Sequence, residues 1–170
     1  MHSEHFRDPR RLSVLDDAEA PFIDAAFELL LPEPSSSCIA ITCRTAEFVD
    51  ERLHSGEECL LERHVDDGQC DIRLSGDQVV HAYRSGIEAV TRHCEAAYGS
   101  AFHRLPPAQR HSVLERLERG SVGAGLEQHR VLFQLLLQHA AEAYFEAFNI
   151  CLQRRVKPSA SSGQSRSAAA

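Results

Sequence analysis

The chain has 170 residues, of which 43% are hydrophobic and 25% charged, and its formal net charge is −7. This composition is typical of a soluble globular protein, and the length predicts one domain with a sizeable core. Acidic residues outnumber basic ones and no basic patch stands out, which argues against binding to nucleic acid or to an anionic membrane surface.

The sequence shows no segment for membrane insertion or export. No apolar run reaches the roughly 18 to 20 residues that a membrane span needs. Residues 1–11 are polar, and Arg10-Arg11 is not followed by the apolar segment of a signal peptide. We therefore expect no membrane span in this chain and a cytoplasmic location, unless a partner carries the chain elsewhere.

Two helices are predicted in the first third of the chain. The first covers residues 16–31, where Asp16 and Glu19 fit a capping box. Its apolar residues recur at helical spacing, and they are Phe22, Ile23, Ala26, Phe27, Leu30 and Leu31. The second helix covers residues 43–53. Residues 55–76 contain three glycines and several acids, and we expect a linker there with a helical turn over residues 59–64. Weak strand patterns occur only at residues 39–42 and 71–74.

The third helix is expected to begin after Ser75-Gly76, with Asp77 as its N-cap, and to end before Gly99. Gly86 lies on its apolar stripe. A glycine costs about 1 kcal/mol of helix propensity there, which close approach of another helix would offset. The fourth helix covers residues 107–119. It begins at Pro107 without a capping side chain, because Pro106 precedes it, and Gly120 ends it.

The last predicted helix, residues 126–154, is apolar around most of its circumference. Its polar residues form one narrow stripe, consisting of Gln134, Gln138, Glu142, Glu146, Asn149 and Gln153. A surface helix of a small bundle needs an apolar face of only about 100°. This helix is therefore either the central helix of the bundle or has one side against a partner. The expected organisation is a flexible segment at 1–12, a single mainly α domain of about five helices at 13–155, and a disordered Ser/Ala-rich tail at 156–170.

Ten histidines and six cysteines raise the possibility of a metal or nucleophile site. The best local metal sets are Cys59 with His64 and the adjacent pair His93-Cys94, but neither has the short paired spacing of a zinc site. Cys94 lies on an apolar helix face, which predicts an inert core thiol. The cysteines, expected mainly as free thiols, are at positions 38, 43, 59, 70, 94 and 151.

Acidic pairs occur at Asp16-Asp17, Glu57-Glu58 and Asp66-Asp67, and adjacent acids in caps or loops are more often solvated than catalytic. No phosphate-binding loop, dinucleotide-binding fingerprint or haem-attachment motif occurs. We therefore expect no catalytic, metal-binding or cofactor-binding residue in this chain. A hydrolase or metal enzyme built from the Cys, His and acidic residues is the enzyme alternative.

A succession of short motifs runs through the second half of the chain. It consists of Tyr83-Arg84-Ser85-Gly86, Tyr98-Gly99, Phe102, Leu105, Pro107-Ala108-Gln109 and Ala143-Tyr144-Phe145-Glu146. Together with Leu31-Pro32 and Phe48-Val49-Asp50, this order resembles the gluconate 2-dehydrogenase subunit 3 family. The resemblance covers residues 13–149. Members of that family are small subunits of bacterial flavin-dependent membrane dehydrogenases.

The resemblance implies a function in partnership rather than in catalysis. Family members join a flavoprotein of the glucose-methanol-choline (GMC) type, which carries FAD and oxidises a sugar or sugar acid, and often a multihaem cytochrome c, which carries haem c. The small subunit is thought to stabilise the flavoprotein and to assist its export, so a partner could carry this chain to the periplasmic side of the inner membrane. The alternative is a free-standing cytoplasmic helical interaction module with an unrelated partner.

The apolar excess of the last helix, together with nearby aromatic residues, would supply the docking surface. The predicted partner-binding residues are Tyr83, Phe102, Leu132, Leu136, Tyr144 and Phe148. Aromatic residues can anchor an interface when part of the ring stays accessible. The competing interpretation is that these aromatic side chains are buried, with Phe102 and Leu105 plugging the core between two helices.

Overall fold

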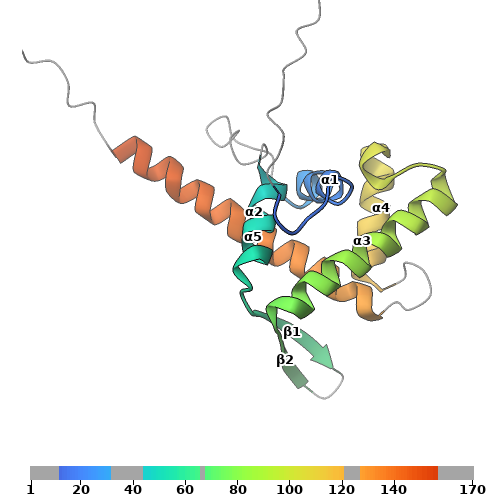
Figure 1. Ribbon diagram of the computed structural model, residues 1–170, viewed down its shortest axis with the longest axis horizontal. Coiled ribbons are helices and arrows are strands. Elements are labelled where there is room, and N and C mark those ends of the chain that lie inside the picture. The colour runs from blue at the N-terminus through green and yellow to red at the C-terminus, as the bar shows by residue number, and fades with distance from the viewer. Residues whose placement is uncertain (1–11, 32–43, 66–67, 121–126, 157–170) are drawn as a thin grey trace, which may run out of the picture.

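The computed structural model describes residues 12–31, 44–65, 68–120 and 127–156. Within these ranges the protein is mainly α, as predicted, and one antiparallel hairpin accompanies the helices (Figure 1). The elements in chain order are α1 (Ala20–Leu30), α2 (Thr45–Ser55), β1 (Cys59–Val65), β2 (Gly68–Leu74), α3 (Gly76–Tyr98), the 3-10 turn η1 (Phe102–Arg104), α4 (Pro107–Glu118) and α5 (Glu127–Val156).

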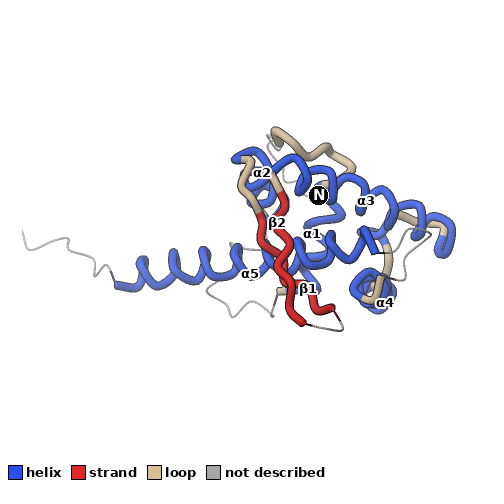
Figure 2. Tube along the Cα trace, turned by 90° about the horizontal axis from the view of Figure 1, so that it is seen from below, coloured by secondary structure: helices blue, strands red, loops and turns tan. Residues whose placement is uncertain are grey.

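Helix α5 is the central element of the fold. Its first half packs against α1, α2, α3, α4 and β1, so that one core forms around it. Its second half leaves the other helices and projects from them as a single rod, which both views show (Figures 1 and 2). None of the helices in the described ranges is both long and apolar enough to cross a membrane.

The capping box predicted for the first helix is present. Oδ1 of Asp16 accepts the backbone N–H groups of Ala18 and Glu19 at 2.8 and 2.7 Å, and Oε2 of Glu19 accepts the N–H of Asp16 at 3.0 Å. Regular α-helix begins only at Ala20, because a turn occupies the residues between. Burial raises the pKa of the Glu19 carboxyl.

Two carboxylates fix α2 and the segment before α1. Oδ1 of Asp24, on α1, accepts the Thr45 hydroxyl at 2.6 Å and the Ala46 N–H at 3.1 Å, which satisfies donors at the start of α2. Asp50, on α2, is buried and accepts the backbone N–H groups of the three residues 13–15 at 2.7, 2.8 and 2.8 Å. The second helix was predicted two residues too early at each end.

The predicted linker with a helical turn is wrong, because residues 59–65 and 68–74 form a two-stranded antiparallel hairpin. The pairing runs from Cys59 opposite Leu74 to Val65 opposite Gly68. Cys59 and Leu61 are buried and Leu60 between them is exposed, so the first strand has one face on the core. The weak strand pattern at 71–74 falls within β2, whereas the one at 39–42 lies outside the described residues.

Helix α3 begins one residue before Asp77, and its N-cap is Ser75, so the predicted cap is wrong. Gln78 completes a capping box there, since its amide oxygen accepts the Ser75 N–H at 2.9 Å. The prediction for Gly86 is confirmed: a Cβ at this position would lie 2.6 Å from Cδ2 of Leu132, so α3 and α5 are in close contact. Gly99 ends α3 with φ 66°.

Between α3 and α4, Phe102 in η1 is buried and its ring centroid lies 4.9 Å from that of Phe22, which confirms the predicted plug. Pro107 is the first residue of α4, and the preceding Pro106 makes no side-chain cap, as predicted. Gly120 follows this helix with φ 69°. Arg110 ties α4 to α1, since its Nη1 donates to the carbonyl of Ala25 at 3.2 Å and to Glu28 at 2.7 Å.

Candidate interaction site

The first half of α5 has its apolar stripe inside the protein. Its buried side chains are His129, Leu132, Leu135, Leu136, His139, Ala140 and Ala143. The interpretation of this helix as the centre of the bundle therefore holds over the first half. Ala143 is the last buried residue of this stripe among the described side chains. The second half of α5 projects from the other helices (Figure 1).

The second half of α5 carries large apolar side chains that are exposed among the residues that the structure describes. The exposed fraction is 63% for Phe145, 42% for Phe148 and 43% for Ile150, and about two turns before residue 144 it is 50% for Leu137. Tyr144 is half-buried, and its ring centroid lies 6.1 Å from that of Phe145 and 6.4 Å from that of Phe148. We call residues 144–150 the α5 end.

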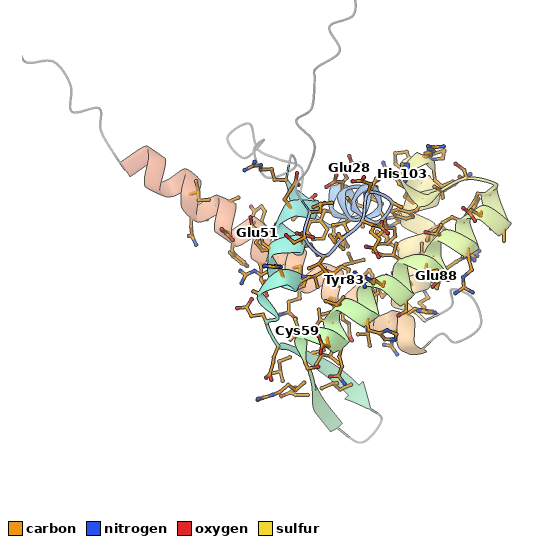
Figure 3. The ribbon with its side chains drawn as sticks, viewed as in Figure 1. Glu28, Glu51, Cys59, Tyr83, Glu88 and His103 are labelled. Carbon is orange, nitrogen blue, oxygen red and sulfur yellow. The ribbon has the colours of Figure 1, made fainter. Side chains whose placement is uncertain are left out.

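A hollow of about 270 Å³ lies between α2 and the α5 end. It is lined by Phe48, Glu51, Arg52, Ser55, Glu57 and Glu146. Figure 3 shows Glu51 on α2 in this region. Three carboxylates and one guanidinium give the lining an excess of negative charge.

Arg52 is the cation of this hollow, and its charge is already engaged. Its Nη1 donates to Oε2 of Glu57 at 2.8 Å, its Nε lies 3.6 Å from Oε2 of Glu142, and its guanidinium carbon lies 5.2 Å from the centroid of the Phe48 ring. The hydrogen bond to Glu57 is the main reason that the pKa of Arg52 is raised. Arg52 also attracts Glu146 electrostatically, and the lining keeps an excess of two carboxylates over its one described cation.

A second polar group lies deep in the core, next to α5. Nδ1 of His139 lies 2.8 Å from the hydroxyl of Tyr83 on α3, and its Nε2 lies 3.8 Å from Sγ of Cys59 on β1. Figure 3 shows Tyr83 in the middle of the body and Cys59 where the hairpin begins. Sequence reasoning missed this group, because Cys59 and His139 are 80 residues apart and no spacing pattern connects them.

The protonation states of this group do not suit nucleophilic catalysis. Burial raises the pKa of the Cys59 thiol, lowers that of His139 and raises that of Tyr83 well above its usual value. A cysteine nucleophile works as the thiolate, which a neighbouring imidazolium stabilises, whereas burial here favours the neutral form of both groups. The arrangement is that of a structural hydrogen-bond network within the core.

Of the two local metal sets from the sequence, only His93-Cys94 has both of its side chains among those described. Cys94 is a buried core thiol, as predicted, and burial raises its pKa to about 11. The neighbouring His93 ring packs edge-on against Tyr98 at 6.3 Å. The side chain of His64 lies outside the described residues. Among the side chains that are described, no three His, Cys, Asp or Glu residues form a group able to hold a metal.

The acidic pairs serve structural roles or face solvent where they are described. Asp16 caps the turn that precedes α1, and Glu57 and Glu58 are more than half exposed and pair with Arg52 and Arg73. Asp66-Asp67 lies outside the described residues.

The structure separates the six predicted partner-binding residues into two sets. Four of them are core residues with no accessible surface for a partner, namely Tyr83, Phe102, Leu132 and Leu136. Tyr144 and Phe148 lie on the α5 end and are accessible. Phe145 and Ile150 were not in the predicted set. Their accessibility depends on where α5 leaves the body, which the pattern of the helix alone does not reveal.

These features define a mainly helical protein with one core and a helix end whose described apolar side chains are exposed. It belongs to the gluconate 2-dehydrogenase subunit 3 family, whose family model matches residues 17–147. This confirms the resemblance seen in the sequence, and membership implies an accessory-subunit role in a multisubunit gluconate dehydrogenase complex. No curated protein and no solved structure matched the chain.

Proposed function

We propose that this protein is a non-catalytic small subunit that binds and stabilises an FAD-dependent gluconate or sugar dehydrogenase of the GMC flavoprotein type. The observation that carries the proposal is the uncovered α5 end in a member of this family. Burying a Phe or Ile side chain that is about half exposed contributes on the order of 1 kcal/mol, so several such residues can anchor a partner.

The accessory role assigns the chemistry to the partners. The flavoprotein would bring FAD and oxidise the substrate, and a multihaem cytochrome c with haem c would accept the electrons. The small subunit would act by covering apolar surface of the flavoprotein, which stabilises the folded flavoprotein by mass action. Such a role requires an exposed apolar surface on a rigid element, and the α5 end has this form.

The proposal is tested by purifying the tagged full-length chain from its native cells. We expect the preparation to show the visible absorption of bound flavin and to contain a large oxidoreductase at equal stoichiometry. Its gluconate or sugar oxidation is then assayed with an artificial electron acceptor. A colourless chain that purifies alone would contradict the proposal and would favour the free-standing interaction module.

A further inference from the structure

The apolar side chains of the α5 end do not lie on one face of the helix. Successive residues of an α-helix are about 100° apart, which places Ile150 about 160° around the axis from Phe148. Both side chains are exposed, at 43% and 42%, and Phe145 lies beside Phe148. A flat partner surface could cover only one of these two sides. A helix that is apolar on opposite sides is normally enclosed by protein.

One of the two sides continues the stripe that α5 buries in its own core. Ile150 is seven residues after the buried Ala143 and eleven after the buried His139, which are spacings of residues on one helix face. Among the described side chains, that stripe is buried as far as Ala143 and exposed at Ile150. The second half of α5 projects from the other helices (Figures 1 and 2). A second protein that covers Ile150 would extend the existing helix packing along the same line.

The charge beside the α5 end indicates the polar chemistry of the occupant. Glu51, Glu57 and Glu146 line the hollow against one described cation, Arg52, which donates to Glu57 and also attracts Glu146. A net negative charge therefore remains in the lining. A lysine or arginine at the rim of the partner would complement these acids. A carboxylate brought to the same place would be repelled.

The exposed area argues against a second copy of this chain as the occupant. Phe145, Phe148 and Ile150 together expose on the order of 300 Å² if a full aromatic side chain presents about 200 Å². A stable interface buries about 800 Å² on each partner. Self-pairing would also bring the acidic hollows of two copies together. A groove can cover the sides of Phe148 and Ile150 together and leave Glu146 at its rim, whereas one face of a second copy can cover only one of these sides.

We infer that the α5 end inserts into an apolar groove of the flavoprotein subunit, with a basic side chain of the groove rim against Glu146 and Glu51. This inference rests on the proposed function and specifies its docking element. In this binding mode an amphipathic helix lies in a hydrophobic groove of its partner and is anchored by side chains about one turn apart.

The test measures the affinity of the full-length chain for the flavoprotein that co-purifies with it. The variants are Phe148→Glu and Ile150→Glu, which place a charge on opposite sides of the helix, and Glu146→Lys at the rim. The matched controls are Leu60→Glu, at an equally exposed leucine on the hairpin, and Glu118→Lys, at the end of α4. All five positions are exposed, so the melting temperature of each isolated variant should stay close to that of the wild type.

We expect both Phe148→Glu and Ile150→Glu to weaken binding by about tenfold or more, and Glu146→Lys to weaken it less, while the controls bind as the wild type does. If Phe148→Glu and Ile150→Glu both bind the flavoprotein as tightly as the wild type does, the inference is overturned but the proposed function stands. Loss of binding in only one of these two variants would indicate a flat contact in place of a groove, and it would also overturn the inference. A wild-type chain that retains no flavoprotein would overturn the proposed function. An isolated wild-type dimer that Phe148→Glu dissociates would assign the α5 end to self-association instead.

Discussion

The hydroxyl of Tyr83 on α3 lies 2.8 Å from Nδ1 of His139 on α5, and both side chains are buried. The two rings are nearly parallel, with 5° between their planes and 5.7 Å between their centroids. Through its other nitrogen, His139 also approaches Cys59 on β1 at 3.8 Å. One histidine thus connects the hairpin and α3 to the central helix, and its hydrogen bonds fix the positions of the three elements relative to one another.

Removing the Tyr83 hydroxyl should destabilise the protein. Tyr83→Phe keeps the ring in the core but leaves a buried nitrogen of His139 without its partner, which costs roughly 1 to 3 kcal/mol of unfolding free energy. Urea unfolding of the isolated chain measures this loss. Tyr98→Phe is the matched control, because Tyr98 is half-buried and outside this network. Equal stability of the wild type and Tyr83→Phe would show that the hydrogen bond contributes nothing net.

The unfolding free energy should fall as the pH drops below about 6.5. Burial lowers the pKa of His139, with Glu142 acting in the opposite direction and Arg52 in the same one. The unfolded chain therefore takes up a proton near pH 6.5, where the folded chain does not. The stability that neutral His139 provides is complete above that pH and is lost progressively as the pH falls toward the folded pKa.

This dependence is measured by urea unfolding at pH 7.5 and at pH 5.5. His103 and His129 also have pKa values lowered by burial, and Glu19, whose pKa burial raises, acts in the opposite direction, so the wild-type change combines several groups. His139→Gln removes the contribution of His139. We expect this variant to reduce the difference in unfolding free energy between the two pH values by on the order of 1 kcal/mol. His81→Gln, at an exposed histidine of α3, is the control. A wild-type stability that rises on acidification over this range would contradict the assignment.

Gly86→Ala should destabilise the contact between α3 and α5, although alanine favours a helix. The new Cβ would lie 2.6 Å from Cδ2 and 2.8 Å from Cβ of the buried Leu132. Overpacking costs typically 1 to 3 kcal/mol, which exceeds the gain of about 1 kcal/mol in helix propensity. A double-mutant cycle with Leu132→Ala tests the cause. Leu132→Ala removes Cδ2 but keeps Cβ, so the two losses should sum to more than the loss of the double variant. Simple additivity would exclude a clash with Cδ2.

The sequence was sufficient to predict the helices and the close contact between α3 and α5 at Gly86. Local rules predicted the capping box at Asp16, the first position of α4 at Pro107 and the helix ends at Gly99 and Gly120, because each depends on residues within one turn. Gly86 gave a correct tertiary prediction, since a glycine on an apolar helix stripe is costly unless another helix approaches it closely.

The hairpin and the core network could not be predicted in the same way. In β1 the alternation is short, with one exposed leucine between the buried Cys59 and Leu61, and the acidic residues around it favoured a linker. The dipeptide Asp67-Gly68, which often marks a hairpin turn, was the signal that could have been used. The partnership of Tyr83, His139 and Cys59 arises only from the packing of three elements, and so does the burial of Leu132 and Leu136.

Asp50→Asn should loosen the segment that precedes α1. The two carboxylate oxygens accept the N–H groups of Ser13, Val14 and Leu15, and an amide retains the shape but replaces one acceptor by a donor. A lost buried charge-assisted bond, with a donor facing a donor, should cost roughly 2 to 3 kcal/mol in urea unfolding. Hydrogen exchange should show faster exchange of these three amides. Glu51→Gln, at the adjacent exposed position, is the control. Slow exchange of the three amides in Asp50→Asn would mean that packing of Leu15 in the core, rather than Asp50, holds the segment in place.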